Sequence, residues 1–183
     1  MLLKELPAVL TEPMYYLSRL QREKVLEIPG LAGYADELPG WLPHRVVSTA
    51  LGYGTDAIEA ATEQLGRPYV WATEFENVHN TWLYPEPQLH IGGRLYNGSE
   101  AYFQSQKPSP YNDEWDNRKW NVMVTAVEAK LKASTDVLEL RMSTRDHPLL
   151  SIKEDDEWGW HPRTYAGENW LAKIYEEQRR RRA

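Results

Sequence analysis

The spacing of apolar and polar residues along the chain predicts more helix than strand. Apolar side chains recur every three or four residues over 117–133, which places Trp120, Met123, Val127 and Leu131 on one face of a helix. Periodicity or end signals predict further helices over 14–28, 55–65, 99–107 and 135–142, and from about 167 into the C-terminal arginines. The residues expected to cap three of these helices are Thr55, Ser99 and Thr135.

Strands are predicted to be few and short. The two expected strand segments are 69–72 and 88–96, and the glycine pair at 92–93 divides the second into a hairpin. A brief strand is expected at 149–152, and the Pro- and Gly-rich segment 31–45 is expected to be irregular surface chain. Because the helices are concentrated late in the chain, the predicted fold class is α+β, mainly helical with a small antiparallel sheet.

The composition is typical of one globular domain and excludes several kinds of functional site. The 183 residues are 42% hydrophobic and 26% charged, which is ordinary for a packed domain. No cysteine is present, so disulfides, thiolate metal sites and a cysteine nucleophile are excluded. The five histidines show no metal-ligand spacing, and we expect neither a metal nor another cofactor. A net charge of −6 argues against binding nucleic acid mainly through its phosphates, but it permits recognition of one nucleotide in a pocket.

The distribution of apolar and aromatic residues gives two further expectations. No apolar run approaches the roughly 20 residues that a membrane span needs, and Pro7 and Pro13 interrupt the start of the chain, so we expect a cytoplasmic protein. The eight Trp and eleven Tyr, against two Phe, suit clefts that stack a base or a sugar. The alternative is that most of these rings fill the core and its edges.

The predicted helix over 99–107 carries the first candidate chemistry. Glu100 falls in its first turn, where the helix dipole keeps a carboxylate ionised. Lys107 follows seven residues later on nearly the same face, about 10 Å along the axis. Such a carboxylate can activate water or stabilise an oxocarbenium-like sugar carbon, and the lysine can bind an anion or attack as an amine. The alternative is a solvated helix in which Glu100 only complements the dipole.

The segment 158–170, WGWHPRTYAGENW, is the second candidate. A glycine-bearing loop ahead of a helix offers free backbone N–H groups to an anion, and Asn169 adds an amide that can contact ribose. Its four aromatic residues can flank a base. The alternative is an ordinary loop followed by a capped helix. The neighbouring acidic run 154–157 is interpreted as solvated loop, because consecutive carboxylates cannot all face one ion.

Several motifs in a fixed order resemble the NADAR (YbiA-like) family. They begin with FEN at 75–77 and GGRLYNGSEAYFQSQK at 92–107, followed by Trp115 ahead of VMVTAVEAKL at 122–131. The set continues with DVLELRMSTRDHPLLSI at 136–152, WG at 158–159 and GENWLAKIYEEQR at 167–179. The resemblance covers roughly 75–180. Residues 71–183 are therefore expected to form the family's catalytic core, with residues 1–70 as an atypical N-terminal extension packed on it.

The resemblance implies a hydrolase that cleaves the N-glycosidic bond between ribose C1′ and a base or amine nitrogen. One implied substrate is ADP-ribose attached to guanine in nucleic acid or nucleosides, with a toxin ADP-ribosyltransferase as a functional partner. The other is a phosphoribosylamino-pyrimidine intermediate of riboflavin biosynthesis. By position, Glu100 is the implied catalytic carboxylate and Lys107 a second catalytic group. The implied substrate-binding residues are Asn77, Tyr96, Trp115, Trp158, Gly159, Gly167 and Asn169.

Three departures from the family pattern bear on the substrate. The link between Lys107 and Trp115 is short where many relatives have a longer segment, which favours an open cleft and a bulky ADP-ribosylated substrate. The loop at 160–166 reads WHPRTYA and places Trp160 where relatives often have Asp. Ala172 replaces a glycine of the last helix. The altered loop keeps a third alternative open, a non-catalytic module that binds ADP-ribose or a nucleotide.

Overall fold

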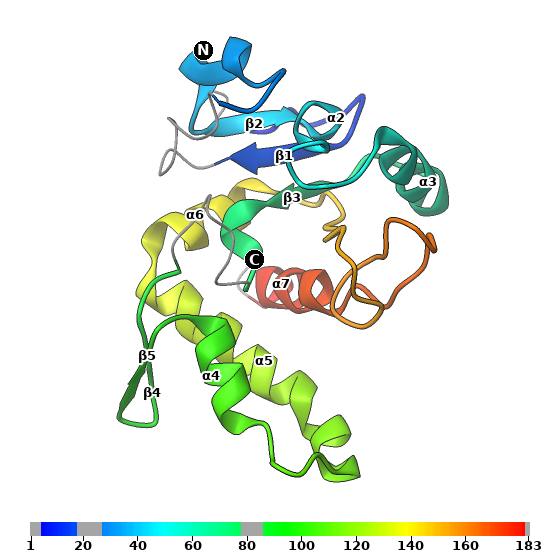
Figure 1. The fold of residues 1–183 in the computed structure, drawn as a ribbon. Coiled ribbons are helices and arrows are strands. Elements are labelled where there is room, and N and C mark those ends of the chain that lie inside the picture. Colours follow the sequence, from blue (N-terminus) through cyan, green and yellow to red (C-terminus); the bar gives the residue numbers. More distant parts are fainter. Residues whose placement is uncertain (1–4, 18–26, 78–85, 182–183) are drawn as a thin grey trace.

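The computed structural model describes residues 5–17, 27–77 and 86–181. A small sheet and two N-terminal helices form one end of the molecule, and a long helix with a shorter one beside it extends from the other (Figure 1). The C-terminal helix lies between these two parts. This arrangement of short strands and mostly later helices confirms the predicted α+β class.

The main sheet has three strands in the order β2-β1-β3. The central strand β1, Met14–Leu17, pairs antiparallel with β2, Gly40–Pro43, and parallel with β3, Val70–Ala72. The sheet is therefore mixed, and only the small hairpin of β4, Leu89–Ile91, and β5, Arg94–Tyr96, is purely antiparallel. That hairpin turns at the glycine pair, both members of which have positive φ, as predicted.

Two sequence predictions in the N-terminal part are wrong. The helix expected over 14–28 begins instead as strand β1, in which alternate side chains are buried, and residues 18–26 lie outside the described part. Alternation of burial is the strand period, and it overrides the weaker helical spacing. The segment expected to be irregular at 31–45 contains a 3-10 turn, Ala32–Glu37, strand β2 and the short helix α2, His44–Val47.

Helix α3, Thr55–Leu65, has the predicted bounds, but its details differ. Gly54 rather than Thr55 is its N-cap, and no side chain caps the helix. Gly66 ends it in the left-handed conformation that glycine favours. Leu65, the last residue of the helix, is 39% exposed, while Ile58 is buried.

Four helices build the second half of the molecule. They are α4, Ser99–Gln106, α5, Asp113–Ala133, α6, Thr135–Ser143, and α7, Trp170–Arg180. Their residues follow the predicted segments, but the N-caps are Gly98 for α4 and Ser134 for α6 in place of Ser99 and Thr135. The expected strand at 149–152 forms only isolated bridges, Leu149 with Val70 and Ile152 with Trp160.

One large apolar cluster joins side chains from both sides of residue 70. Leu17 and Leu42 of the sheet belong to the same cluster as Val127 of α5 and Ile174 of α7. Burying these side chains together is the main stabilising term of such a fold. The N-terminal strands therefore pack on the later helices, whereas a domain division at residue 70 stays a prediction. Within the described residues, no helix is long and apolar enough to span a membrane.

Candidate functional site

Phe103 of α4 brings two predicted site residues together. The ring of Trp115, which is buried at the start of α5, lies 5.1 Å from the Phe103 ring between centroids. The Trp158 ring also contacts the Phe103 ring, edge-on at 5.3 Å. Trp158 also meets Trp170 at 5.5 Å, again edge-on. Because Trp158 is only partly buried, part of this aromatic cluster reaches the surface beside α4.

Glu100 and Lys107 both lie along α4, but they do not contact each other. The half-buried Glu100 accepts a hydrogen bond from Gln104 Nε2 at 2.6 Å, one turn later. Lys107 follows the last residue of α4 and is exposed, with its Nζ 5.8 Å from the centre of the Tyr111 ring. The carboxylate therefore lies at the start of the helix near Phe103, and the ammonium lies at its open end.

Asp155 orders the loop that carries Trp158. Its Oδ1 accepts the backbone N–H of Trp158 at 2.7 Å and that of Glu157 at 2.9 Å. The sequence interpretation of 154–157 as a solvated acidic run missed this role. An Asp two or three residues ahead of a tight turn is a usual signal for such a side-chain-to-backbone contact. Glu157 in turn binds Lys119 of α5 at 2.7 Å, which fixes the loop against the helix.

The two predicted glycines permit close packing of backbone. A Cβ on Gly159 would lie 2.3 Å from Lys153 Cγ and 2.9 Å from the Ser151 carbonyl oxygen. Gly167 has φ of +148°, and a Cβ there would lie 2.4 Å from the Gly159 carbonyl oxygen. Their contact with ribose or phosphate stays a prediction. What the structure shows is that neither position has room for a side chain.

Asn169 uses its amide within the protein. Its Oδ1 accepts the backbone N–H of Ser151, and its Nδ2 donates to the Leu149 carbonyl, each at 3.0 Å. The residue adopts the left-handed conformation at the N-cap of α7, which Asn tolerates better than most residues. Asn169 thus joins the start of α7 to the chain that adjoins β3, and its predicted contact with substrate is untested.

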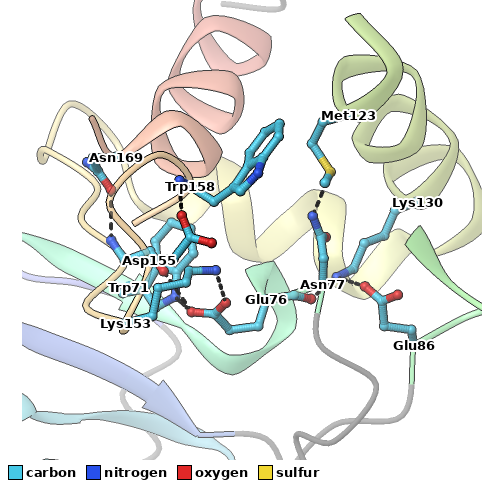
Figure 2. A network of polar contacts seen from close by, with 11 residues as sticks. Trp71, Glu76, Asn77, Glu86, Met123, Lys130, Lys153, Asp155, Trp158 and Asn169 are labelled. Carbon is cyan, nitrogen blue, oxygen red and sulfur yellow. Dashed lines mark hydrogen bonds and ion pairs between the residues drawn. The ribbon is translucent and has the colours of Figure 1, made fainter. Parts of the chain in front are cut away.

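Glu76 is the buried carboxylate of the FEN motif, and the predicted set of site residues did not include it. It accepts hydrogen bonds from Trp71 Nε1 at 2.6 Å, Ser151 Oγ at 2.9 Å and Lys153 Nζ at 2.8 Å (Figure 2). Burial alone would raise its pKa, but the Lys153 charge and the three donors outweigh burial and hold the pKa below its usual value. The partners lie up to 77 residues away in sequence, so no local pattern indicates them.

Two neighbours of Glu76 have buried oxygens without hydrogen-bond partners among the described residues. Glu74 Oε2 is one, and burial raises the pKa of Glu74 to about 8 despite the nearby positive charge of Lys130. Asn77 Oδ1 is the other, although its Nδ2 lies 2.8 Å from Met123 Sδ on α5 (Figure 2). An unsatisfied buried acceptor is costly, so a donor that reached the buried Asn77 oxygen would form a stabilising hydrogen bond with it.

Lys130 of α5 binds the backbone of Glu76, on the side away from Lys153 (Figure 2). Its buried Nζ donates to the Glu76 carbonyl oxygen at 2.7 Å and to Glu86 Oε1 at 2.6 Å (Figure 2). The predicted site residue Tyr96 lies on β5, half-buried, with its ring edge-on to Tyr102 of α4 at 5.1 Å. Tyr96 thus supports α4 from the hairpin side.

A groove of about 720 Å³ lies elsewhere, between α3 and the chain that precedes β1. Its lining includes Glu12, Arg45 and Ile58 and none of the predicted site residues. Shape alone would select this groove, but its Arg45 and Glu12 bind each other at 2.8 Å and it contains none of the residues of the ordered motifs, so we place the candidate site at the α4–α5–Trp158 region instead. Among the described residues, no group of three His, Asp or Glu side chains could hold a metal ion.

Comparison with known proteins gives one informative similarity. The fold is similar to the NMR structure of the E. coli protein YbiA, with a TM-score of 0.50 and 22% sequence identity over 59% of this chain and 76% of that chain. No protein-family model and no curated protein matches the sequence. At this level of identity the similarity confirms the predicted YbiA-like fold, and function has to be argued from the site itself.

Proposed function

We propose that this protein is a metal-independent N-glycosidase that removes ADP-ribose from guanine. The observation that carries the proposal is the position of Glu100. It is a half-buried carboxylate in the first turn of α4, three residues before Phe103 of the aromatic cluster. Within the described part of the chain, its one hydrogen bond comes from Gln104. A carboxylate that retains free lone pairs beside aromatic rings suits attack at a sugar carbon whose base stacks on those rings.

The proposed reaction needs one carboxylate and one water molecule. Glu100 accepts a proton from water as the water oxygen bonds to C1′, and its negative charge stabilises the oxocarbenium-like transition state. The bond between C1′ and the guanine nitrogen breaks with its electron pair on nitrogen, which takes up a proton from solvent, and Glu100 then releases to solvent the proton that it took from the water. Trp158, partly buried beside Phe103, stacks on the base. Asn77 Oδ1, which has no hydrogen-bond partner among the described residues, accepts a hydrogen bond from substrate after a small local opening.

Lys107 has a lesser role in this proposal. It is exposed beyond the last turn of α4, so its ammonium is fully hydrated and poorly placed to act as an amine nucleophile. We assign it to binding the negatively charged phosphates of the substrate. The remaining predicted site residues have a structural role in this proposal, because they hold the backbone and the aromatic rings around the site in place. They are Tyr96, Trp115, Gly159, Gly167 and Asn169.

The short connection between α4 and α5 favours the larger of the two candidate substrates. Helix α4 ends at Gln106 and α5 begins at Asp113, so little chain is available to cover the end of the site. An ADP-ribosylated guanine needs such an open end, whereas a small phosphoribosylated pyrimidine gains from enclosure. We therefore rank the first substrate above the second.

The test is a hydrolysis assay with ADP-ribosyl-guanosine and a phosphoribosylamino-pyrimidine supplied side by side. We expect release of ADP-ribose, and a loss of about 100-fold or more in kcat for Glu100→Gln. Glu139→Gln, an exposed glutamate on α6, is the matched control and should keep wild-type activity. Equal rates for Glu100→Gln and wild type would remove Glu100 from the reaction. Tight ADP-ribose binding with no turnover of either substrate would instead identify a binding module.

A further inference from the structure

Helix α4 begins without a cap from its own sequence. Its N-cap residue is Gly98, and no side chain from the N-cap position bonds to the first turn. The hydroxyl of Ser99, although buried, has no hydrogen-bond partner among the described residues. The first backbone N–H groups of a helix need acceptors, because the helix itself supplies none. Something else must therefore hold the start of the helix that carries Glu100.

The acceptor comes from Glu86, thirteen residues earlier. Glu86 Oε2 accepts the backbone N–H of Ser99 at 2.5 Å, and its carboxylate lies at the positive end of the α4 dipole. Gly98 makes this contact possible: it has φ of +98°, and a Cβ there would lie 2.3 Å from Glu86 Oε2. A side chain at residue 98 would therefore displace the Glu86 carboxylate from the Ser99 N–H.

Lys130 holds Glu86 in turn. The Lys130 ammonium donates to Glu86 Oε1 at 2.6 Å and to the Glu76 carbonyl oxygen at 2.7 Å. Both side chains of the ion pair are buried, with exposed fractions of 0% for Lys130 and 6% for Glu86. A buried pair with satisfied hydrogen bonds has a narrow range of geometries, so it can transmit position from α5 to α4.

We propose that Lys130 and Glu86 are positioning residues for Glu100. We call Lys130, Glu86 and the Ser99 N–H the α4 clamp. Through these contacts α5 fixes the first turn of α4 and so the position of Glu100, the residue after Ser99. The inference rests on the proposed function, because it assigns the clamp to the catalytic carboxylate. Supporting contacts of this kind set how accurately a reacting group is held.

Two double variants isolate the hydrogen bond to Ser99. Lys130→Met combined with Glu86→Gln keeps an acceptor oxygen at position 86, and Lys130→Met combined with Glu86→Leu removes it. Neither leaves a buried unpaired charge, so both should fold. We expect kcat to fall about threefold in the Gln double variant, which loses Lys130 but keeps the acceptor, and about tenfold or more in the Leu double variant, with KM equal within about threefold. A Gln double variant with the kcat of wild type would remove Lys130 from the clamp. Lys132→Met, an exposed lysine on α5, is the control.

Equal kcat in the two double variants would overturn the proposal, as would a loss that follows the melting temperature alone. Hydrogen exchange separates this inference from the proposed function and needs no substrate. The amides of the first turn of α4 should exchange about fivefold to tenfold faster in the Leu double variant than in the Gln double variant. If wild type shows no turnover, the proposed function fails, and equal exchange in the two variants then refutes the clamp on its own.

Discussion

The two carboxylates at the candidate site have opposite surroundings. Glu76 is buried and accepts hydrogen bonds from three donors, one of them the ammonium of Lys153. Glu100 is half-buried and accepts one hydrogen bond, from a glutamine on its own helix. A saturated carboxylate has few lone pairs left for water or substrate, whereas a sparsely bonded one retains them. The difference favours a structural role for Glu76 and, under the proposed function, a chemical role for Glu100.

The same substitution at both positions tests this assignment and gives the largest expected effects. Glu76→Gln leaves Lys153 without its anion and should lower the free energy of unfolding by about 3 kcal/mol, because a buried pair is broken from one side. Glu100→Gln should change that free energy by less than about 0.5 kcal/mol while removing activity. Urea unfolding of both variants, measured beside their kcat, checks the contrast. A stable Glu76→Gln protein that has lost all activity would reverse the two roles.

Comparing Glu74 with Glu76 separates the effect of burial on a carboxyl pKa from the effect of charged and hydrogen-bonding partners. Glu74 is buried like Glu76 but lacks a cation at hydrogen-bond distance among the described residues, and burial raises its pKa to about 8. The folded state therefore binds a proton that the unfolded state releases near pH 4.3, so the stabilising contribution is lost as pH rises through 8. The lowered pKa of Glu76 has the opposite sign, and its contribution is lost as pH falls below the unfolded value.

We therefore expect wild type to lose about 2 kcal/mol more than Glu74→Gln between pH 6 and pH 9. Unfolding free energies of the two proteins across this range measure the difference. Glu139→Gln on the exposed face of α6 should follow wild type throughout. Parallel curves for Glu74→Gln and wild type would mean that Glu74 is ionised in the folded protein and that burial does not control it.

Lys107 should give the smallest effect. Because it is exposed, Lys107→Met should leave the free energy of unfolding within about 0.5 kcal/mol of wild type. If it binds phosphate, KM for the ADP-ribosylated substrate should rise about tenfold with kcat nearly unchanged, because binding lost equally from ground and transition states appears in KM. A fall in kcat as large as that of Glu100→Gln would instead make Lys107 part of the chemistry.

Local sequence signals predicted the parts of the fold that depend on neighbouring residues. The period of α5, the glycine pair of the β4–β5 hairpin and the left-handed end of α3 at Gly66 all follow from residues within a few positions of one another. Strand β1 was missed because four residues carry little periodic information and its partners, β2 and β3, come much later in the chain.

The residues of the candidate site also fall into those that local sequence signals indicated and those that only the tertiary contacts revealed. The sequence by itself placed Glu100 in the first turn of a helix and marked Trp158 and Asn77 as site residues, because helical position and motif order are local properties. Only the tertiary structure supplied Glu76 with Lys153 and joined Lys130 through Glu86 to Ser99. Those contacts join residues 13 to 77 positions apart, and only packing decides which distant side chains meet and which carboxylate stays accessible.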